Sequence, residues 1–104
     1  MKIFLDSCEV NLIKEYKEIG IIDGVTTNPT HLFKEGANAR ELILTICDHV
    51  KDGDVSVEVT EREPELIYTQ AKAIAQLRDN IVVKIPCHRD YYGVIARLVC
   101  EGVA

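Results

Sequence analysis

The chain has 104 residues, of which 47% are hydrophobic and 28% charged, a composition that predicts one globular domain with a modest core. Its net charge of -5 and pI near 5.1 argue against a polyanionic partner, so we expect no binding of nucleic acid. The apolar stretch at the start is too short for a signal peptide, and no apolar run approaches the roughly 18 residues of a membrane span. We therefore expect a soluble, cytoplasmic protein with no membrane partner.

Strand and helix patterns alternate along the chain with little linker between them. Short β-branched runs predict strands over residues 2–6, 23–27, 55–59 and 81–85. Apolar residues at helical spacing predict helices over residues 9–19, 39–50, from residue 64, and over 90–100. A short helical turn is expected over residues 29–36.

Several residues are typical of helix ends. Ser7 is expected to cap the first helix and Gly20 to end it. Asn38 and Glu41 resemble a capping box before the second helix, and Pro64 suits the first position of the third.

The side of each helix that faces the core follows from the same spacing. The expected inward residues are Leu12, Tyr16 and Ile19; Leu42, Ile43, Ile46, Cys47 and Val50; Ile67, Ala71, Ile74 and Leu77; and Val94, Ile95, Leu98 and Val99. The four cysteines are widely spaced without a Cys-x-x-Cys pair, which favours reduced, mostly packed thiols over zinc ligands or disulfides.

Four strand–helix units predict an α/β fold with a parallel sheet and right-handed crossovers. In the third strand, Val55, Val57 and Val59 share one face, and Ser56 and Glu58 lie on the other. Such two-faced parallel strands are unusual in doubly wound sheets but suit a barrel, whose inner face can turn polar at the carboxyl ends of its strands.

Each predicted strand delivers one polar group to that end: Asp6, Asn28, Glu58 and Lys84. Their separations of 22, 30 and 26 residues correspond to about 208 residues for eight units, the size of a compact (β/α)8 barrel. Residues 1–104 therefore read as a single domain of four βα units, half of such a TIM barrel.

Lys84 stands near the end of its β-branched strand, just before Pro86. Taken alone, it is explained by a solvated strand end. Held in the interior, desolvation would favour the neutral amine, a nucleophile able to attack a ketone or aldehyde.

The strings FLD (4–6), GVTTNP (24–29), VEV (57–59) and VVKIP (82–86) resemble the small transaldolases and the sister fructose-6-phosphate aldolases, in the same order and over the whole chain. The resemblance implies a Schiff-base enzyme on a (β/α)8 barrel, without metal or other cofactor, acting on sugar phosphates.

The resemblance also implies roles for single residues. Lys84 would form the Schiff base, Asp6 would act as acid and base near the substrate hydroxyls, and Glu58 would move protons through a water. Asn28 would hold the dihydroxyacetone moiety, with Thr26 and Thr27 of the same string expected to bind substrate. Glutamate at position 58 is similar to transaldolases, whereas the aldolase sisters carry glutamine there.

Simpler explanations exist for three of these residues. Asp6 could precede the first helix as a cap, Asn28 could only cap the turn after it, and Glu58 could lie on a solvated strand face. That all four polar residues, Lys84 included, occupy these positions by coincidence is the weaker interpretation.

The chain departs from the family pattern after the VVKIP string, where His88 replaces a small polar residue, and at Thr30, where serine is usual. His88 either modulates proton transfer or faces solvent in a loop. The threonine, serine and phosphate-binding arginines that the family carries on later strands have no counterpart in these 104 residues.

Three hypotheses remain open: a transaldolase-type enzyme, with fructose-6-phosphate aldolase cleavage as its variant; a catalytically silent relative acting as an oligomerising or binding module; and a flavodoxin-like open sheet that binds a partner. In a half-barrel, the edges at strands 2–6 and 81–85 are unpaired, and Phe4 and Val82 face water. We therefore expect a homo-oligomer or a complementing C-terminal half-barrel as partner.

Overall fold

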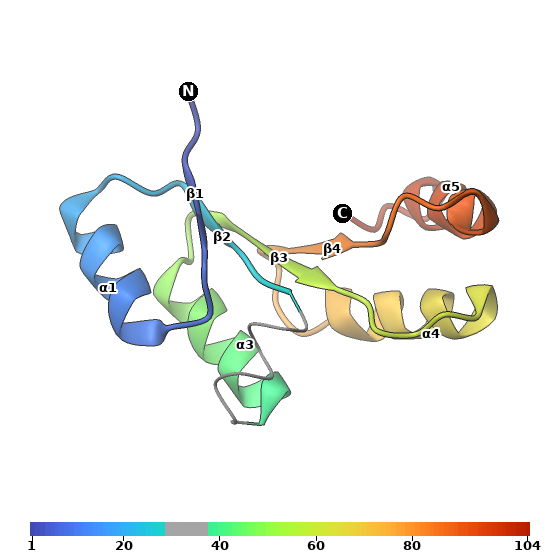
Figure 1. Cartoon of the computed structure of the whole chain (residues 1–104), viewed down its shortest axis with the longest axis horizontal. Coiled ribbons are helices and arrows are strands. Elements are labelled where there is room, and N and C mark those ends of the chain that lie inside the picture. The colour runs from blue at the N-terminus through green and yellow to red at the C-terminus, as the bar shows by residue number, and fades with distance from the viewer. Residues whose placement is uncertain (29–37) are drawn as a thin grey trace.

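The structure, a computed structural model, describes residues 1–28 and 38–104; the turn expected over residues 29–36, with Thr30, lies outside them. The elements in chain order are β1 (Phe4–Asp6), α1 (Val10–Ile19), β2 (Gly24–Thr26), α3 (Ala39–His49), β3 (Asp54–Glu58), α4 (Pro64–Ala75), β4 (Ile81–Lys84), the 3-10 turn η1 (Arg89–Tyr91) and α5 (Tyr92–Cys100). All four expected strands and all four expected helices are present (Figure 1), which confirms the alternation.

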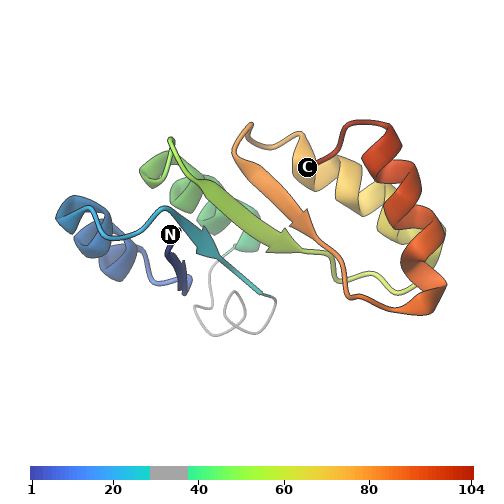
Figure 2. The same ribbon diagram turned by 90° about the horizontal axis from the view of Figure 1, so that it is seen from above.

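The strands form one parallel sheet in the order β1-β2-β3-β4 (Figure 2). Each strand therefore lies beside its predecessor, as in half of a (β/α)8 barrel. A flavodoxin-like sheet places its second strand outside the first, and this order differs from that hypothesis.

The alternation in β3 is confirmed. Val55, Val57 and Val59 are at most 4% exposed, whereas Ser56 and Glu58 are only half-buried on the opposite face. Burying each valine fully contributes about 1.5–3 kcal/mol relative to leaving it exposed.

Two apolar clusters lie between the sheet and its helices. The first packs α1 and α3 on the sheet, with Cys8, Ile13, Ile22, Val25, Ile43, Ile46, Cys47, Val50, Val55, Val57 and Ile81. The second packs α4 and α5 together, with Val59, Ile67, Ala71, Val94 and Leu98. The four cysteines all lie in the described ranges and outside disulfides; Cys8 and Cys47 are packed as expected, whereas Cys87 and Cys100 are exposed.

Most of the expected helix ends are confirmed. Asn38 caps α3, since its Oδ1 accepts the backbone N–H groups of Arg40 at 3.0 Å and Glu41 at 3.4 Å. Gly20 ends α1, and Pro64 occupies the first turn of α4.

The expected cap at Ser7 is wrong. Glu9 is the N-cap of α1, without a side-chain hydrogen bond, and Ser7 Oγ instead accepts the N–H of Glu9 at 3.0 Å. The serine therefore stabilises the turn before the helix.

Two expected inward residues are also misplaced. Ile13 is fully buried under α1, whereas Ile19 is 64% exposed in the last turn. On α5, Val94 and Leu98 are buried four residues apart, and Val99 is 66% exposed because it lies a further 100° around the helix.

The sheet face opposite the helices is open among the described residues. It carries a hollow lined by Phe4, Val25, Thr26, Asp54, Ser56 and Val82, with no helical residue among them. Phe4 is 42% exposed there, and its ring lies over Gly24, where an added Cβ would clash with the backbone oxygen of Asp54 and with the ring. This close approach explains the glycine that begins the GVTTNP string.

The edge at β4 differs from the expectation of an unpaired strand. The N–H of Val83 donates to the carbonyl of Ala104 at 3.0 Å, so the end of the chain returns along β4, as the C label in Figure 1 shows. In the described part of the chain, no helix is long and apolar enough to cross a bilayer.

Candidate active site

Lys84 is the last residue of β4 and lies opposite Glu58 at the end of β3. The paired register puts both side chains on the open face, with Lys84 Nζ 3.9 Å from Glu58 Oε2. The amine also donates a 3.0 Å hydrogen bond to the backbone carbonyl of Thr27, which follows β2. The Lys84 side chain is 41% exposed, so it borders the open face and is not enclosed in an interior.

Asp6 and Thr26 form the matching pair at the ends of β1 and β2. They are partners in the strand register, and Thr26 Oγ1 donates to Asp6 Oδ1 at 3.0 Å. The carboxyl ends of all four strands therefore carry polar side chains that the sequence singled out.

Thr27 is placed differently from Thr26. Its side chain is fully buried, its Oγ1 donates to the Ser56 carbonyl at 2.7 Å, and its backbone N–H donates to the same carbonyl at 3.1 Å. The Thr27 hydroxyl is thus committed to β3, and its expected binding of substrate stays a prediction. Asn28 follows, half-buried, and its contact with substrate also stays a prediction.

His88 lies in the loop after β4 with a side chain that is 62% exposed. Its Nδ1 accepts the backbone N–H of Asp90 at 3.2 Å and caps η1. This geometry agrees with the second of the two alternatives for His88, a loop histidine that faces solvent. It also gives this residue, which departs from the family pattern, a local structural role.

The loop after β3 is held by a residue that sequence reasoning missed. Gln70 of α4 accepts the N–H groups of Thr60 at 2.9 Å and Glu61 at 3.0 Å, and its Nε2 donates to Thr60 Oγ1 at 2.8 Å. The sequence offered one signal for this role: Gln70 is a polar residue next to Ala71, which was expected to face the core. These bonds fix the backbone that follows Glu58.

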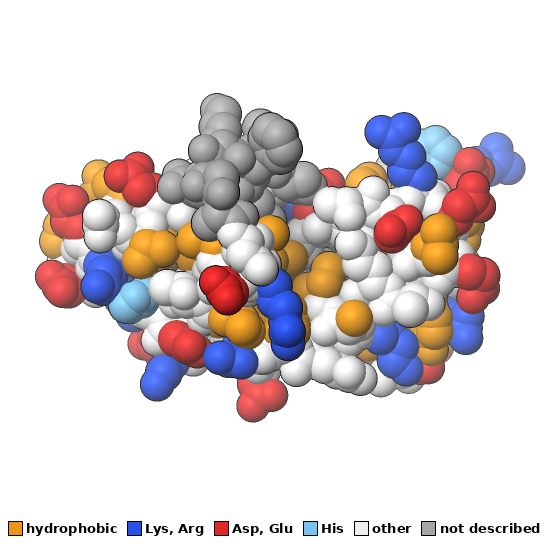
Figure 3. Space-filling view, turned by 90° about the horizontal axis from the view of Figure 1, so that it is seen from below, with side chains coloured by type: hydrophobic (Ala, Val, Ile, Leu, Met, Phe, Trp, Pro, Cys, Tyr) orange, Lys and Arg blue, Asp and Glu red, His pale blue; other side chains and the backbone are white. Residues whose placement is uncertain are grey.

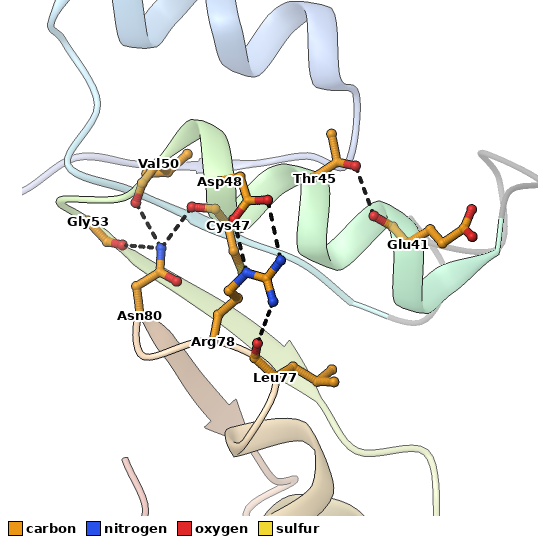
Figure 4. Close-up of polar contacts among 9 residues, drawn as sticks. All are labelled: Glu41, Thr45, Cys47, Asp48, Val50, Gly53, Leu77, Arg78 and Asn80. Carbon is orange, nitrogen blue, oxygen red and sulfur yellow. Dashed lines mark hydrogen bonds and ion pairs between the residues drawn. The ribbon is translucent and has the colours of Figure 1, made fainter.

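A second polar cluster, the Asn80 clamp, lies at the amino ends of β3 and β4 (Figure 4). Asn80 Nδ2 donates to the carbonyls of Val50 at 2.9 Å, Cys47 at 3.1 Å and Gly53 at 3.2 Å. Next to it, Arg78 binds both carboxylate oxygens of Asp48, at 3.0 and 3.4 Å, and this hydrogen bonding lowers the pKa of Asp48. The side-chain amide of Asn80 therefore provides donors for carbonyls at the end of α3 and in the turn after it.

The arrangement of the described charged groups bears on whether the protein has a metal or polyanion site. Among residues 1–28 and 38–104, no three His, Cys, Asp or Glu side chains gather as metal ligands would. On the face drawn in Figure 3, acidic and basic side chains are interspersed, so a polyanion finds no continuous basic surface there.

Comparison with known proteins points to a single family. Residues 3–104 match the family described as Transaldolase/Fructose-6-phosphate aldolase. Similar proteins named probable transaldolase occur in Dictyoglomus turgidum, with 49% identity over 90 residues, and in Dehalococcoides mccartyi, with 40% identity over 104 residues. These alignments cover 86% and 99% of this chain but 42% and 48% of the relatives, so the chain spans about half the length of the curated relatives it matches.

Proposed function

Because the chain belongs to the transaldolase/fructose-6-phosphate aldolase family, we propose that it carries the Schiff-base part of a transaldolase site. The activity is the transfer of a dihydroxyacetone unit from a ketose phosphate to an aldehyde acceptor. The observation that carries the proposal is the amine of Lys84 on the open face, 3.9 Å from a carboxylate.

Lys84 is the nucleophile. Its neutral amine adds to the ketose carbonyl, and the carbonyl oxygen then leaves as water to give a cationic imine. Cleavage of the C3–C4 bond releases an aldehyde and leaves its electron pair as an enamine, stabilised by that cation. Addition of the enamine to the acceptor aldehyde and hydrolysis of the new imine return the free lysine.

Glu58 and Asp6 handle the protons. A 3.9 Å separation is too long for a direct hydrogen bond between Lys84 Nζ and Glu58 Oε2 and suits transfer through a bridging water. Asp6, held by Thr26 at the end of β1, is the base for the hydroxyl whose carbon–carbon bond breaks. Asn28 holds the dihydroxyacetone hydroxyls.

The open face requires a covering partner, since Phe4 and Val82 line an uncovered hollow. We propose four further βα units that continue the sheet beside β4. The bond between Val83 N–H and the Ala104 carbonyl supports a parallel strand at that edge. A homodimer that joined β1 of one copy to β4 of the other would need the end of the chain to leave β4, so we expect sedimentation equilibrium to give the mass of a monomer.

Borohydride reduction in the presence of fructose 6-phosphate or dihydroxyacetone tests the chemistry. We expect a stable adduct on the peptide that contains Lys84, abolished by Lys84→Met and retained in Lys51→Met, a control at an exposed lysine. A wild-type chain that stays folded and forms no adduct would instead support a catalytically silent binding module.

Release of free dihydroxyacetone separates transfer from aldolase cleavage. The carboxylate at position 58 favours transfer, because the aldolase sisters carry glutamine there. Accumulation of dihydroxyacetone without transfer to an added aldehyde would assign cleavage as the main activity.

A further inference from the structure

The geometry points to Thr27 as a positioning residue for the nucleophile, acting through its backbone carbonyl and not through contact with substrate. This inference rests on the proposed function of Lys84. We infer that the buried hydroxyl of Thr27 fixes the direction of the Thr27 carbonyl, and that this carbonyl fixes the position of the Lys84 amine.

Thr27 is tied to β3 twice. Its hydroxyl and its backbone N–H both donate to the Ser56 carbonyl, at 2.7 and 3.1 Å, and the side chain has no exposed surface. Two donors from one residue on one acceptor, in a buried setting, leave the peptide after Thr27 little freedom to rotate. The Thr27 carbonyl is therefore held in a defined direction.

Lys84 reaches that carbonyl across an intervening strand. Thr27 follows β2 and Lys84 ends β4, with β3 between them. Neighbouring strands are about 4.8 Å apart, so the lysine must extend over the end of β3 to reach it. The 3.0 Å bond to the Thr27 carbonyl holds the amine in that extended position, within 3.9 Å of Glu58.

The carbonyl thus selects one position for a side chain that has four rotatable bonds and is 41% exposed. Without it, the amine can swing from the open face into solvent. Loss of orientation lowers reaction with a bound ketose, but it makes the amine more accessible to a small, non-specific reagent. The two reactivities should therefore change in opposite directions.

Thr27→Val tests this prediction, because valine keeps the shape of the buried side chain and removes only the hydroxyl donor. We expect reductive trapping of dihydroxyacetone at Lys84 to fall about tenfold, since misplacement of a reacting group carries costs of this order or more. Acetylation of Lys84 by limiting acetic anhydride should rise about threefold relative to Lys51, the value of one hydrogen bond.

Thr27→Ser is the matched control, since serine retains the hydroxyl and should restore both rates. Urea denaturation of each variant reports the stability lost. If Thr27→Val does not fold, Thr27→Ala, which puts no methyl group near the Ser56 carbonyl, replaces it in the same two assays.

A folded Thr27 variant with unchanged trapping and acetylation at Lys84 overturns the inference. Equal changes at Lys84 and Lys51 also overturn it, because they indicate a general loss of structure. Absence of any imine in the wild type defeats the proposed function instead, and the acetylation ratio still decides whether Thr27 positions the amine.

Discussion

The two ends of the same parallel strands use polar side chains in opposite ways. At the amino ends, Asn80 donates to three backbone carbonyls, and all of these partners are internal. At the carboxyl ends, Lys84 makes one such bond, to the Thr27 carbonyl, and its amine stands 3.9 Å from Glu58 on the open face, too far for a direct hydrogen bond. Asn80 and Lys84 are only four residues apart in sequence.

Under the proposed function, this difference would separate a stabilising residue just before β4 from a reactive residue at its end. Carbonyls at a helix end need donors, and a side chain that supplies them stabilises the fold and is no longer available to a ligand. A lysine and a carboxylate that are not fully satisfied by each other remain available to substrate and water. In (β/α)8 barrels the carboxyl ends host catalysis and the amino ends contribute to stability, and the proposed function assigns Lys84 and Asn80 to these two roles.

Removal of the Asn80 amide gives the largest expected effect. Asn80→Ala should lower the free energy of unfolding by about 3 kcal/mol, because the two N–H groups of Nδ2 are shared among three carbonyls, and each carbonyl left unsatisfied costs roughly 1 kcal/mol or more. Urea denaturation measures this loss. Trapping of ketose at Lys84, measured well below the unfolding midpoint, should stay at the wild-type rate. A slower reaction in fully folded protein would show that the two ends are coupled.

Glu58→Gln is the converse change, with a large effect on chemistry and none on stability. We expect imine formation to slow about 100-fold, equivalent to about 2.7 kcal/mol of barrier, because glutamine keeps the shape but cannot accept a proton. The balance of any residual activity should move from transfer toward cleavage. The urea midpoint should not change, because the side chain lies on the open face; a large shift would assign Glu58 a structural role.

Gly53→Ala tests the amino end by steric means. An added Cβ would clash with the carbonyl oxygen of Asp23, so the backbone must shift, and we expect a loss of about 2 kcal/mol. Gly93→Ala in α5 is the matched control, since its Cβ meets no atom within 4 Å and should stabilise the helix by about 0.5–1 kcal/mol. Equal effects of the two substitutions would contradict the close packing inferred at Gly53.

The fold was predictable where local signals and tertiary contacts agree. Alternating valines in β3 predicted its buried face, and Asn38 and Pro64 mark helix starts because capping depends on nearby backbone groups. The pairing of Glu58 with Lys84 was also accessible, since each is the polar residue at the end of a predicted strand.

The remaining features depend on residues far apart in sequence. The carbonyls bound by Asn80 lie about 30 residues earlier, and Asn80 itself looks like an ordinary turn residue. Thr27 resembled Thr26 in the same string, but strand alternation turns the two side chains to opposite faces. The Asn80 clamp leaves no pattern that periodicity detects, whereas the burial of Thr27 follows from alternation along the predicted strand, although its partner, the Ser56 carbonyl, lies 29 residues later.

The smallest expected effect concerns Cys47, whose carbonyl belongs to the Asn80 clamp. Burial raises the pKa of the Cys47 thiol to about 11, from an ordinary value near 9.0. Between these values the unfolded chain ionises and the folded chain does not, so the stabilising contribution is complete below pH 9 and is lost as pH rises toward 11. At pH 9.5 this contribution to the free energy of unfolding should have fallen by about 1 kcal/mol relative to pH 7.

Cys47→Ala removes the contribution of the thiol. The difference between the pH profiles of the two free energies of unfolding, each measured in urea, therefore separates the thiol from the titration of lysines and tyrosines. Cys100→Ala is the matched control at an exposed thiol. Parallel profiles for wild type and Cys47→Ala across pH 7–10 would mean that the thiol ionises equally in the folded and unfolded chains, and that the amino end is less tightly closed than its contacts indicate.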